Sequence, residues 1–422
     1  MSRFLYIAAG IAGILLLVLI IAVAGFGRKE AEPEPATLEF WGVQDDAEVW
    51  RDVIALFRKD YPHILVNYKR YPADTYEETL VNRLAEGKSP DLFLMPDTWL
   101  IKHRDKIFPL PKASNPLSAA DMKRTFVDDP ATRLVTGDGD LLGLPMFVDS
   151  LVLFYNKDMF EGAGIAEPPG TWDAAAEISQ RMARVSPGGD ITRAGLALGS
   201  AKNVDHALEI VSALILQRGN AIVRANKSVE LDGRADAALA LFASFADSRH
   251  KNFTWTSRMP ASLDAFSAGQ AAMAIGFAED MPRIRAKNPH LQFGVAPLPQ
   301  FAGDSAGRTL GRYLFPAVSR LSKNGSAAWQ FIFYITGKEA SAVYHEESGR
   351  PVARRDLISA GAGNEVDDVF FRASLAARSW PMPDEQAARS VFTETLDAIA
   401  ARTLTPAQAV GWLSSRLFQI MP

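Results

Sequence analysis

Hydrophobic and polar positions alternate with two different periods in the first part of the body of this chain. Residues 37–41 and 64–68 alternate at every second position, as half-buried strands do, and residues 91–95 form a short apolar run. Two segments with apolar residues at helical spacing separate these runs, one ending before Pro62 and one at residues 76–86. This β-α-β-α-β order predicts an α/β domain with a largely parallel sheet.

A further strand is predicted at residues 150–155. After residue 170 the pattern becomes mainly helical, with strands predicted at residues 271–277 and 292–296. A chain of 422 residues is too long for one ordinary hydrophobic core, so two or three domains are expected. The helices predicted in this part of the chain are residues 172–185, 204–216, 234–247, 261–269, 327–336, 340–346, 366–376, 385–401 and 406–418.

One apolar segment stands apart from this pattern. Residues 4–26 carry no charged side chain, and as a helix they would be about 34 Å long, against a bilayer core of about 30 Å. We therefore expect residues 1–27 to be a membrane anchor. A cleaved signal peptide is the alternative, because residues 22–24 (AVA) match a cleavage pattern. Residues 28–36 are acidic and contain proline, which predicts an extended spacer.

Composition excludes several kinds of chemistry. The net charge of −4 argues against a nucleic-acid-binding surface. The chain has no cysteine, which excludes thiolate nucleophiles, cysteine metal sites and a lipidated cysteine. No histidine lies three or four residues from another, and phosphate-loop and nucleophile-elbow motifs are absent from the sequence, so we expect no cofactor and no metal. A pair of carboxylates for glycoside hydrolysis stays open, because their separation is a three-dimensional property.

Five motif blocks follow one another along the body. They are residues 90–93 (PDLF), 143–173 (containing LVLFYNKDMF and TWD), 266–273 (FSAGQAAM), 293–299 (FGVAPLP) and 328–336 (AWQFIFYIT). In this order they resemble the extracellular solute-binding proteins of ABC importers, in the group that includes maltodextrin and other oligosaccharide receptors. The likeness extends from residue 37 to about residue 400.

The resemblance implies a two-lobed, periplasmic-binding-protein-like α/β fold, with interleaved lobes and a ligand cleft, preceded here by one transmembrane helix. Lobe one would comprise residues 37–146 plus 292–337, and lobe two residues 147–291 plus 338–422. The chain departs from the family in lacking a lipid-anchoring cysteine, which the transmembrane helix would replace. It also has Phe277 where the family often places a tryptophan shortly after the AAM segment, residues 271–273.

Candidate ligand residues come first from the rule that ligands of parallel sheets bind beyond the carboxyl ends of the strands. Trp41 and Gln44 follow the first strand, and Asp97 and Trp99 follow the third. Aromatic faces can cover a sugar ring, while carboxylates, amides and arginines bind its hydroxyls. Trp255 is either a stacking platform or a core residue, and core packing is also the alternative for Trp41. The resemblance adds Asp149, Phe277, Glu279, Arg312, Tyr313 and Arg350, with an interlobe salt bridge or a cap as the alternative for Asp149.

The sequence therefore predicts a non-enzymatic, monomeric, membrane-tethered receptor that captures a sugar or oligosaccharide and delivers it to an ABC permease. Its body would lie on the extracytoplasmic side of the cell membrane, or would be secreted or periplasmic if the apolar segment is cleaved. One alternative is a membrane-anchored carbohydrate-active enzyme using two cleft carboxylates. Another is a receptor that serves a sensor protein instead of a transporter.

Overall fold

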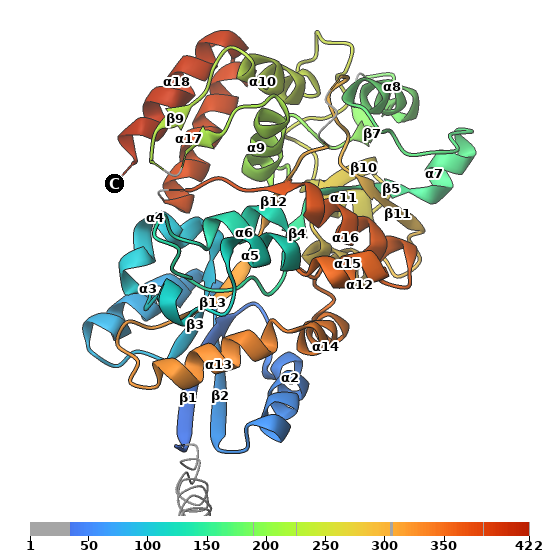
Figure 1. Cartoon of the computed structure of the whole chain (residues 1–422). Helices are drawn as coiled ribbons and strands as arrows, with labels where there is room; N and C mark the ends of the chain where they lie inside the picture. The colour runs from blue at the N-terminus through green and yellow to red at the C-terminus, as the bar shows by residue number, and fades with distance from the viewer. Residues whose placement is uncertain (1–33, 189, 225, 304–306, 383, 422) are drawn as a thin grey trace, which may run out of the picture.

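The computed structural model describes residues 34–188, 190–224, 226–303, 307–382 and 384–421, which form two α/β lobes with separate hydrophobic cores (Figure 1). The apolar segment 4–26 lies outside the described residues. Within the described ranges, no helix is both long and apolar enough to cross a membrane.

Lobe one is built on a four-stranded sheet in the order β13-β3-β1-β2. β1, β2 and β3 are parallel, and β13 pairs antiparallel with β3. The strands are β1 (Ala36–Val43), β2 (Ile64–Tyr71), β3 (Leu92–Pro96) and β13 (Leu314–Val318). Trp50, Val53 and Phe57 recur at helical spacing and are buried against this sheet. The predicted β-α-β-α-β order is confirmed.

Short helices complete lobe one around this sheet. Those between β3 and residue 133 were not predicted, because segments of three to seven residues are too short to show a helical period. The helices of lobe one are α2 (Ala47–Asp60), α3 (Ala73–Ala85), η1 (Asp97–Trp99), α4 (Leu100–His103), η2 (Arg104–Lys106), η3 (Lys112–Ser114), α5 (Ala119–Thr125), α6 (Asp128–Arg133), α13 (Gly325–Ile335), α14 (Lys338–Ser348) and α15 (Arg355–Ala360).

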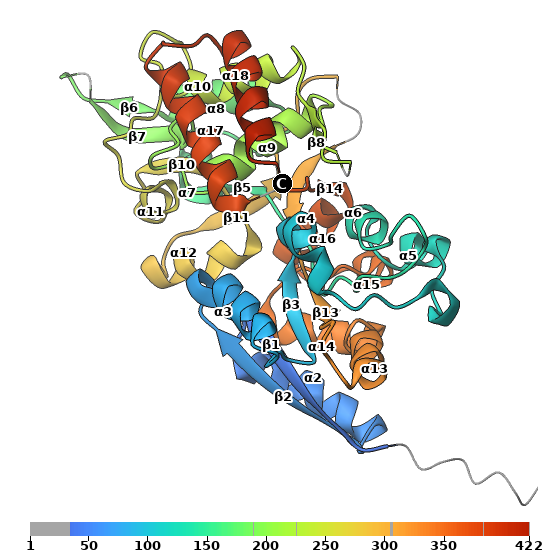
Figure 2. The same cartoon turned by 90° about the vertical axis from the view of Figure 1, so that its left-hand side faces the viewer.

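Lobe two is built on a five-stranded mixed sheet in the order β11-β5-β10-β7-β6. Its strands are β5 (Val152–Asn156), β6 (Arg184–Val185), β7 (Ile191–Leu196), β10 (Ala271–Gly276) and β11 (Phe293–Pro297), with a separate ribbon of β8 (Ile222–Val223) and β9 (Val229–Glu230). The helices are α7 (Lys157–Gly162), α8 (Trp172–Met182), α9 (Ala207–Gln217), α10 (Ala235–Ser244), α11 (Ser262–Ser267), η4 (Ala278–Asp280), α12 (Met281–Lys287), α16 (Glu365–Ala376), α17 (Glu385–Ala400) and α18 (Pro406–Gln419). Every residue of α9 is buried, so this helix is the centre of the lobe. Figure 2 shows α17 and α18 on the side of lobe two far from β1 and β2.

The structure corrects two predictions about lobe two and its boundaries. The helix expected at residues 172–185 ends at Met182, and the chain then turns into β6 and the unpredicted strand β7. The lobe boundaries also differ from those expected. β11 pairs with β5 in lobe two, not in lobe one, and α14 packs on α2 of lobe one, with Tyr344 in its core. The predicted boundaries were taken from the positions of the motifs, and these positions do not show in which hydrophobic core a side chain is buried.

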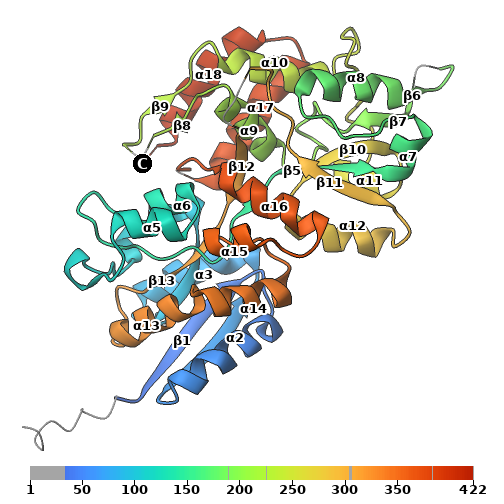
Figure 3. The ribbon, with the colours of Figure 1, turned by 45° about the vertical axis from the view of Figure 1, so that its right-hand side comes forward.

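A third, small sheet lies between the lobes and is called the hinge sheet below. Its order is β14-β12-β4, with β4 (Asp149–Ser150), β12 (Thr309–Arg312) and β14 (Ala377–Arg378). β4 leads from the lobe-one core into the lobe-two core, and β12 leads back from Leu310 in lobe two to Tyr313 in lobe one. Figure 3 shows β12 between the two bodies. The interleaved two-lobed fold is therefore confirmed.

The hinge sheet has no room for a side chain at Gly311. A methyl group there would come within 2.6 Å of the Cβ atom of Ala377 and 3.2 Å of Val148. Because overpacking of this kind costs about 1–3 kcal/mol, we expect Gly311→Ala to lower the midpoint of thermal unfolding. Gly411→Ala is the control, since nothing lies within 4 Å of that position in α18 and alanine favours helices by about 0.5–1 kcal/mol. Equal changes in the two variants would contradict the prediction.

Candidate functional site

A cavity of about 260 Å³ lies beside the hinge sheet and is lined by both lobes. Lobe one contributes the carboxyl ends of β1 and β3 and the helix η1, while lobe two contributes the start of α9, η4 and the start of α17. β12 forms the wall between them. The position beyond the ends of two parallel strands is the one that the sequence predicted for a ligand.

The structure brings six of the predicted site residues together in the lining of this cavity. They are Gln44, Asp97, Trp99, Glu279, Arg312 and Tyr313. Their contact with a ligand stays a prediction, but they share one enclosed space although they come from four separate parts of the sequence.

Trp99 forms an aromatic wall of the cavity. Its ring stacks on Tyr76, with centroids 5.6 Å apart and planes 29° apart, and it meets His103 edge-on. The hydroxyl of Tyr76 donates to the carbonyl oxygens of Leu94, at 2.8 Å, and Trp41, at 3.2 Å. Complete burial raises the pKa of Tyr76 well above its ordinary value, so this hydroxyl stays a donor. The stack is therefore anchored to β1 and β3.

Gln44 occupies a strained backbone conformation at the end of β1. Its φ of 74° lies in the left-handed region, and the N–H of Asp45 donates to the carbonyl of Val43 across it at 2.9 Å, as in a γ-turn. No hydrogen bond of its side chain to another described residue is found, and the side chain is exposed to the cavity. Strain of this kind persists at functional sites, where the surrounding structure enforces it.

Asp97 belongs to a buried cluster that ties the hinge to lobe one. Its carboxylate accepts from Arg133 at 3.3 Å, from the N–H of Tyr313 at 3.2 Å and from the hydroxyl of Ser379. The neighbouring Asp129 accepts from the N–H of Ser379 at 3.1 Å. Burial raises the pKa of Asp97, and it raises that of Asp129 to about 6 in spite of the opposing charge of Arg133. The cluster holds the segment after β14 against lobe one.

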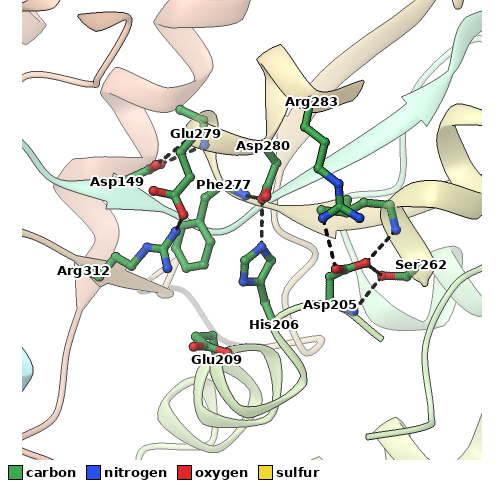
Figure 4. A network of polar contacts seen from close by, with 12 residues as sticks. Asp149, Asp205, His206, Glu209, Ser262, Phe277, Glu279, Asp280, Arg283 and Arg312 are labelled. Atoms are coloured by element: carbon green, nitrogen blue, oxygen red, sulfur yellow. Dashed lines mark hydrogen bonds and ion pairs between the residues drawn. The ribbon is translucent and has the colours of Figure 1, made fainter. Parts of the chain in front are cut away.

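Arg312 and Glu279 line the cavity as an ion pair, and Figure 4 shows the polar network around them. The guanidinium of Arg312 lies 3.9 Å over the ring of Phe277 and forms an ion pair with Glu279. Asp149 accepts from the N–H groups of Ala278, at 2.9 Å, and Glu279, at 3.2 Å. Asp149 is fully buried, and burial raises its pKa to about 6. Asp149 thus fixes the backbone that carries Glu279.

Five predicted residues do not line the cavity, and each has a partner that explains why. Trp41 packs on Tyr71 with ring centroids 4.5 Å apart, and Trp255 is fully buried in the core of lobe two. The carboxylate of Asp149 is engaged by backbone N–H groups, and the ring of Phe277 is covered by Arg312. Arg350 donates to Asp45 at 2.9 Å and stands behind Glu279.

The sequence did not predict the cavity residues supplied by α9 and α17. Glu209, in the first turn of α9, is bound by Arg389 at 2.7 Å; burial opposes its ionisation, but Arg389 lowers its pKa overall. Glu385, at the start of α17, accepts from the hydroxyl of Thr98 at 3.5 Å across the cleft. A glutamate near a helix start is common, since it complements the helix dipole, so neither residue carried a signal of its own.

A second contact between the lobes lies beside the cavity. Lys102 of α4 reaches Asp384, the residue that caps α17, at 3.2 Å, and it also binds Glu77 at 2.8 Å. These side chains are about 40% exposed, so the pair is weak, of the order of 1 kcal/mol or less. The lobes are thus in contact across the cleft through polar groups that water can replace.

The arrangement is suited to binding rather than to proton transfer. Arginines bind Asp97, Glu209 and Glu279, so each of these carboxylates already has a charged partner. In the part of the chain that the structure describes, no group of three or more histidine and acidic side chains could hold a metal ion. What the cavity offers is an aromatic face with fixed hydrogen-bonding groups around it.

The chain belongs to the family of bacterial extracellular solute-binding proteins, whose model matches residues 41–342. A putative binding protein of Brucella abortus is 26% identical over 344 residues, which are 79% of this chain and 78% of that protein. A probable ABC transporter-binding protein of Deinococcus radiodurans is 24% identical over 358 residues, 80% of this chain and 81% of that protein. The sugar-binding protein MalE of Xanthomonas citri has a similar fold, with a TM-score of 0.77 and 20% identity over 91% of this chain and 97% of that one. The cavity between the lobes is thus the candidate solute site.

The raised pKa of Asp129 gives a testable pH dependence. Asp129 keeps its proton up to about pH 6 in the folded state but releases it near pH 3.8 in the unfolded state. The protonated carboxyl therefore stabilises the folded state fully below pH 4. This contribution to the free energy of unfolding is lost as the pH rises through 6. Two pKa units amount to about 3 kcal/mol. Because asparagine cannot ionise, we expect the stability of Asp129→Asn relative to the wild type to improve between pH 4 and pH 7, measured by urea unfolding. The exposed neighbour Asp128→Asn is the control, and a pH-independent difference for Asp129→Asn would refute the assignment.

Proposed function

We propose that this protein is a membrane-tethered extracellular receptor that captures a carbohydrate in the interlobe cavity and delivers it to an ABC permease. The observation that carries this proposal is the position and lining of the cavity. It lies at the hinge of two lobes, and a fixed indole lines it together with carboxylate, amide and guanidinium groups.

The chemistry of the lining suits a sugar. The stacked ring of Trp99 offers an apolar face for the C–H side of a pyranose, and carboxylates such as Glu209 and Glu385 can accept hydrogen bonds from its hydroxyls. The volume of about 260 Å³ lies just below the range of about 300–1,000 Å³ that is usual for drug-sized ligands, which favours a small saccharide. The name of the similar MalE structure, a sugar-binding protein, supports the same class of ligand.

Binding would act by shifting the balance between open and closed lobes. A solute that contacts Trp99 of lobe one and Glu209 of lobe two gains both contacts only when the lobes are together, so it favours the closed form by its difference in affinity. The short strands of the hinge sheet can absorb such a movement while each lobe keeps its own core. The closed form would then be the one that the permease recognises.

The membrane tether and the permease partner rest on sequence. Residues 4–26 are apolar enough to span a bilayer and residues 28–36 would hold the body away from it. The Deinococcus relative is named an ABC transporter-binding protein, which supports a transporter as the partner.

Calorimetric titration of the full-length chain in detergent with a panel of mono- and disaccharides tests the ligand class. We expect one member to bind, and we expect Trp99→Ala to weaken that binding about tenfold or more, because a stacked aromatic ring contributes about 1 kcal/mol beyond the area it buries. Phe418→Ala is the control, since Phe418 is 69% exposed and lies outside the cavity lining. Binding of peptides but of no saccharide would refute the ligand class. Hydrolysis of a glycoside in the same samples would refute the receptor.

Gln44 allows the binding role to be separated from the folding role. Glycine adopts a φ of 74° without strain, so Gln44→Gly should keep or raise the unfolding midpoint while it removes the amide from the cavity. We therefore expect weaker saccharide binding together with unchanged or higher thermal stability. A loss of stability with unchanged affinity would show that the conformation of Gln44 serves folding alone.

A further inference from the structure

The carboxylate of Glu279 is held by two arginines that reach it from different parts of the fold. Arg312, on the hinge strand β12, forms an ion pair with Oε1, and Arg350, on lobe one, lies 3.4 Å from Oε2. Each oxygen thus has its own guanidinium. Two guanidinium groups converging on one carboxylate are the arrangement by which proteins bind carboxylate and phosphate groups of ligands.

Both arginines are held in place independently of Glu279. Arg312 lies over the ring of Phe277 at 3.9 Å, and Arg350 lies over the ring of Phe147 at 4.7 Å. Arg350 is held further by Asp45, whose carboxylate also accepts from the hydroxyl of Tyr344. Aromatic stacking orients each guanidinium, and the ion pair with Asp45 also holds Arg350. The two would therefore keep their positions if the side chain of Glu279 were removed.

Glu279 itself lies at the surface of the cavity. Its side chain is 27% exposed and lines the cavity together with Arg312 and with Phe147, the ring that supports Arg350. Its backbone is fixed by Asp149. The carboxylate therefore occupies the place in the solute cavity that the acidic group of an anionic solute would take.

We propose that Glu279 is a specificity-determining residue, a built-in carboxylate that fills the anion site formed by Arg312 and Arg350 and so restricts the cavity to uncharged solutes. The proposal rests on the proposed function in taking this cavity as the solute site. It deepens that function by naming neutral saccharides as the substrate class and excluding uronic acids and sugar phosphates.

The remaining charges around the cavity act in the same direction. Asp97, Glu209 and Glu385 also line it, while Arg312 is the one basic residue among the described lining residues. An anionic solute would have to displace Glu279 from both arginines and would meet three further carboxylates. A neutral solute neither displaces Glu279 nor is repelled by the other carboxylates, because a carboxylate can accept a hydrogen bond from a sugar hydroxyl.

The test is a gain of function. Glu279→Ala vacates the place between the arginines, and we expect it to bind inorganic phosphate and galacturonate at least tenfold more tightly than the wild type, measured by calorimetry at low salt. The gain should disappear in the double variant Glu279→Ala/Arg312→Ala. Glu385→Ala is the matched control, since it also removes one glutamate from the lining but frees no pair of arginines. Thermal unfolding of each variant checks that it is folded.

Equal gains in Glu279→Ala and Glu385→Ala would overturn the proposal, because net charge alone would then explain them. A folded Glu279→Ala that gains no phosphate binding would overturn it as well.

The wild type offers a second measurement that needs no variant. It should bind a neutral pyranose at least tenfold more tightly than the corresponding uronic acid, and equal binding overturns the proposal. A wild type that binds no saccharide at all refutes the proposed function, while phosphate binding by Glu279→Ala would still support the anion site.

Discussion

The bonds that the carboxylate of Asp149 accepts from the backbone N–H groups of Ala278 and Glu279 join the hinge sheet to the charged groups of the cavity. Asp149 lies on the first crossing between the lobes and pairs in register with Arg312 on the second. Its two bonds fix the start of η4, and η4 carries the carboxylate that reaches Arg312 and Arg350. A buried aspartate can hold this place because both of its oxygens have donors, which offsets part of the cost of its burial. A change in the position of the hinge strands therefore also moves the charged side chains that line the cavity.

The parts of the fold that the sequence predicted are those in which local pattern and tertiary structure agree. The alternation of residues 37–41 and the helical spacing that includes Val53 and Phe57 describe faces that are in fact buried. Gln44, Asp97 and Trp99 could be placed because the ends of parallel strands meet at one edge of a sheet. For these three residues, the end of the preceding strand was enough to predict that they lie at the cavity.

The parts that could not be predicted depend on which distant segments come together. Glu209 and Glu385 reach the cavity because α9 and α17 point their first turns toward it, and nothing in the sequence around them distinguishes them from other residues at helix starts. Trp255 is an aromatic residue of the type that stacks on sugars, but it is fully buried in the core. Only the packing of lobe two decides between these two roles. The assignment of β11 to lobe two depends on its pairing with β5, more than a hundred residues away in the chain.

The pairing of β13 with β3 has a consequence for the order in which the protein can be made. Leu92 lies opposite Val318, so the sheet of lobe one lacks its last strand until most of the chain has been synthesised. The sheet of lobe two is complete earlier, at Pro297. Strand β3, which is made early, therefore lacks its partner β13 while the whole sheet of lobe two is synthesised. Such long-range pairing makes folding slow and keeps the nascent chain open, which is a useful property for a polypeptide that has to be threaded through a membrane before it folds.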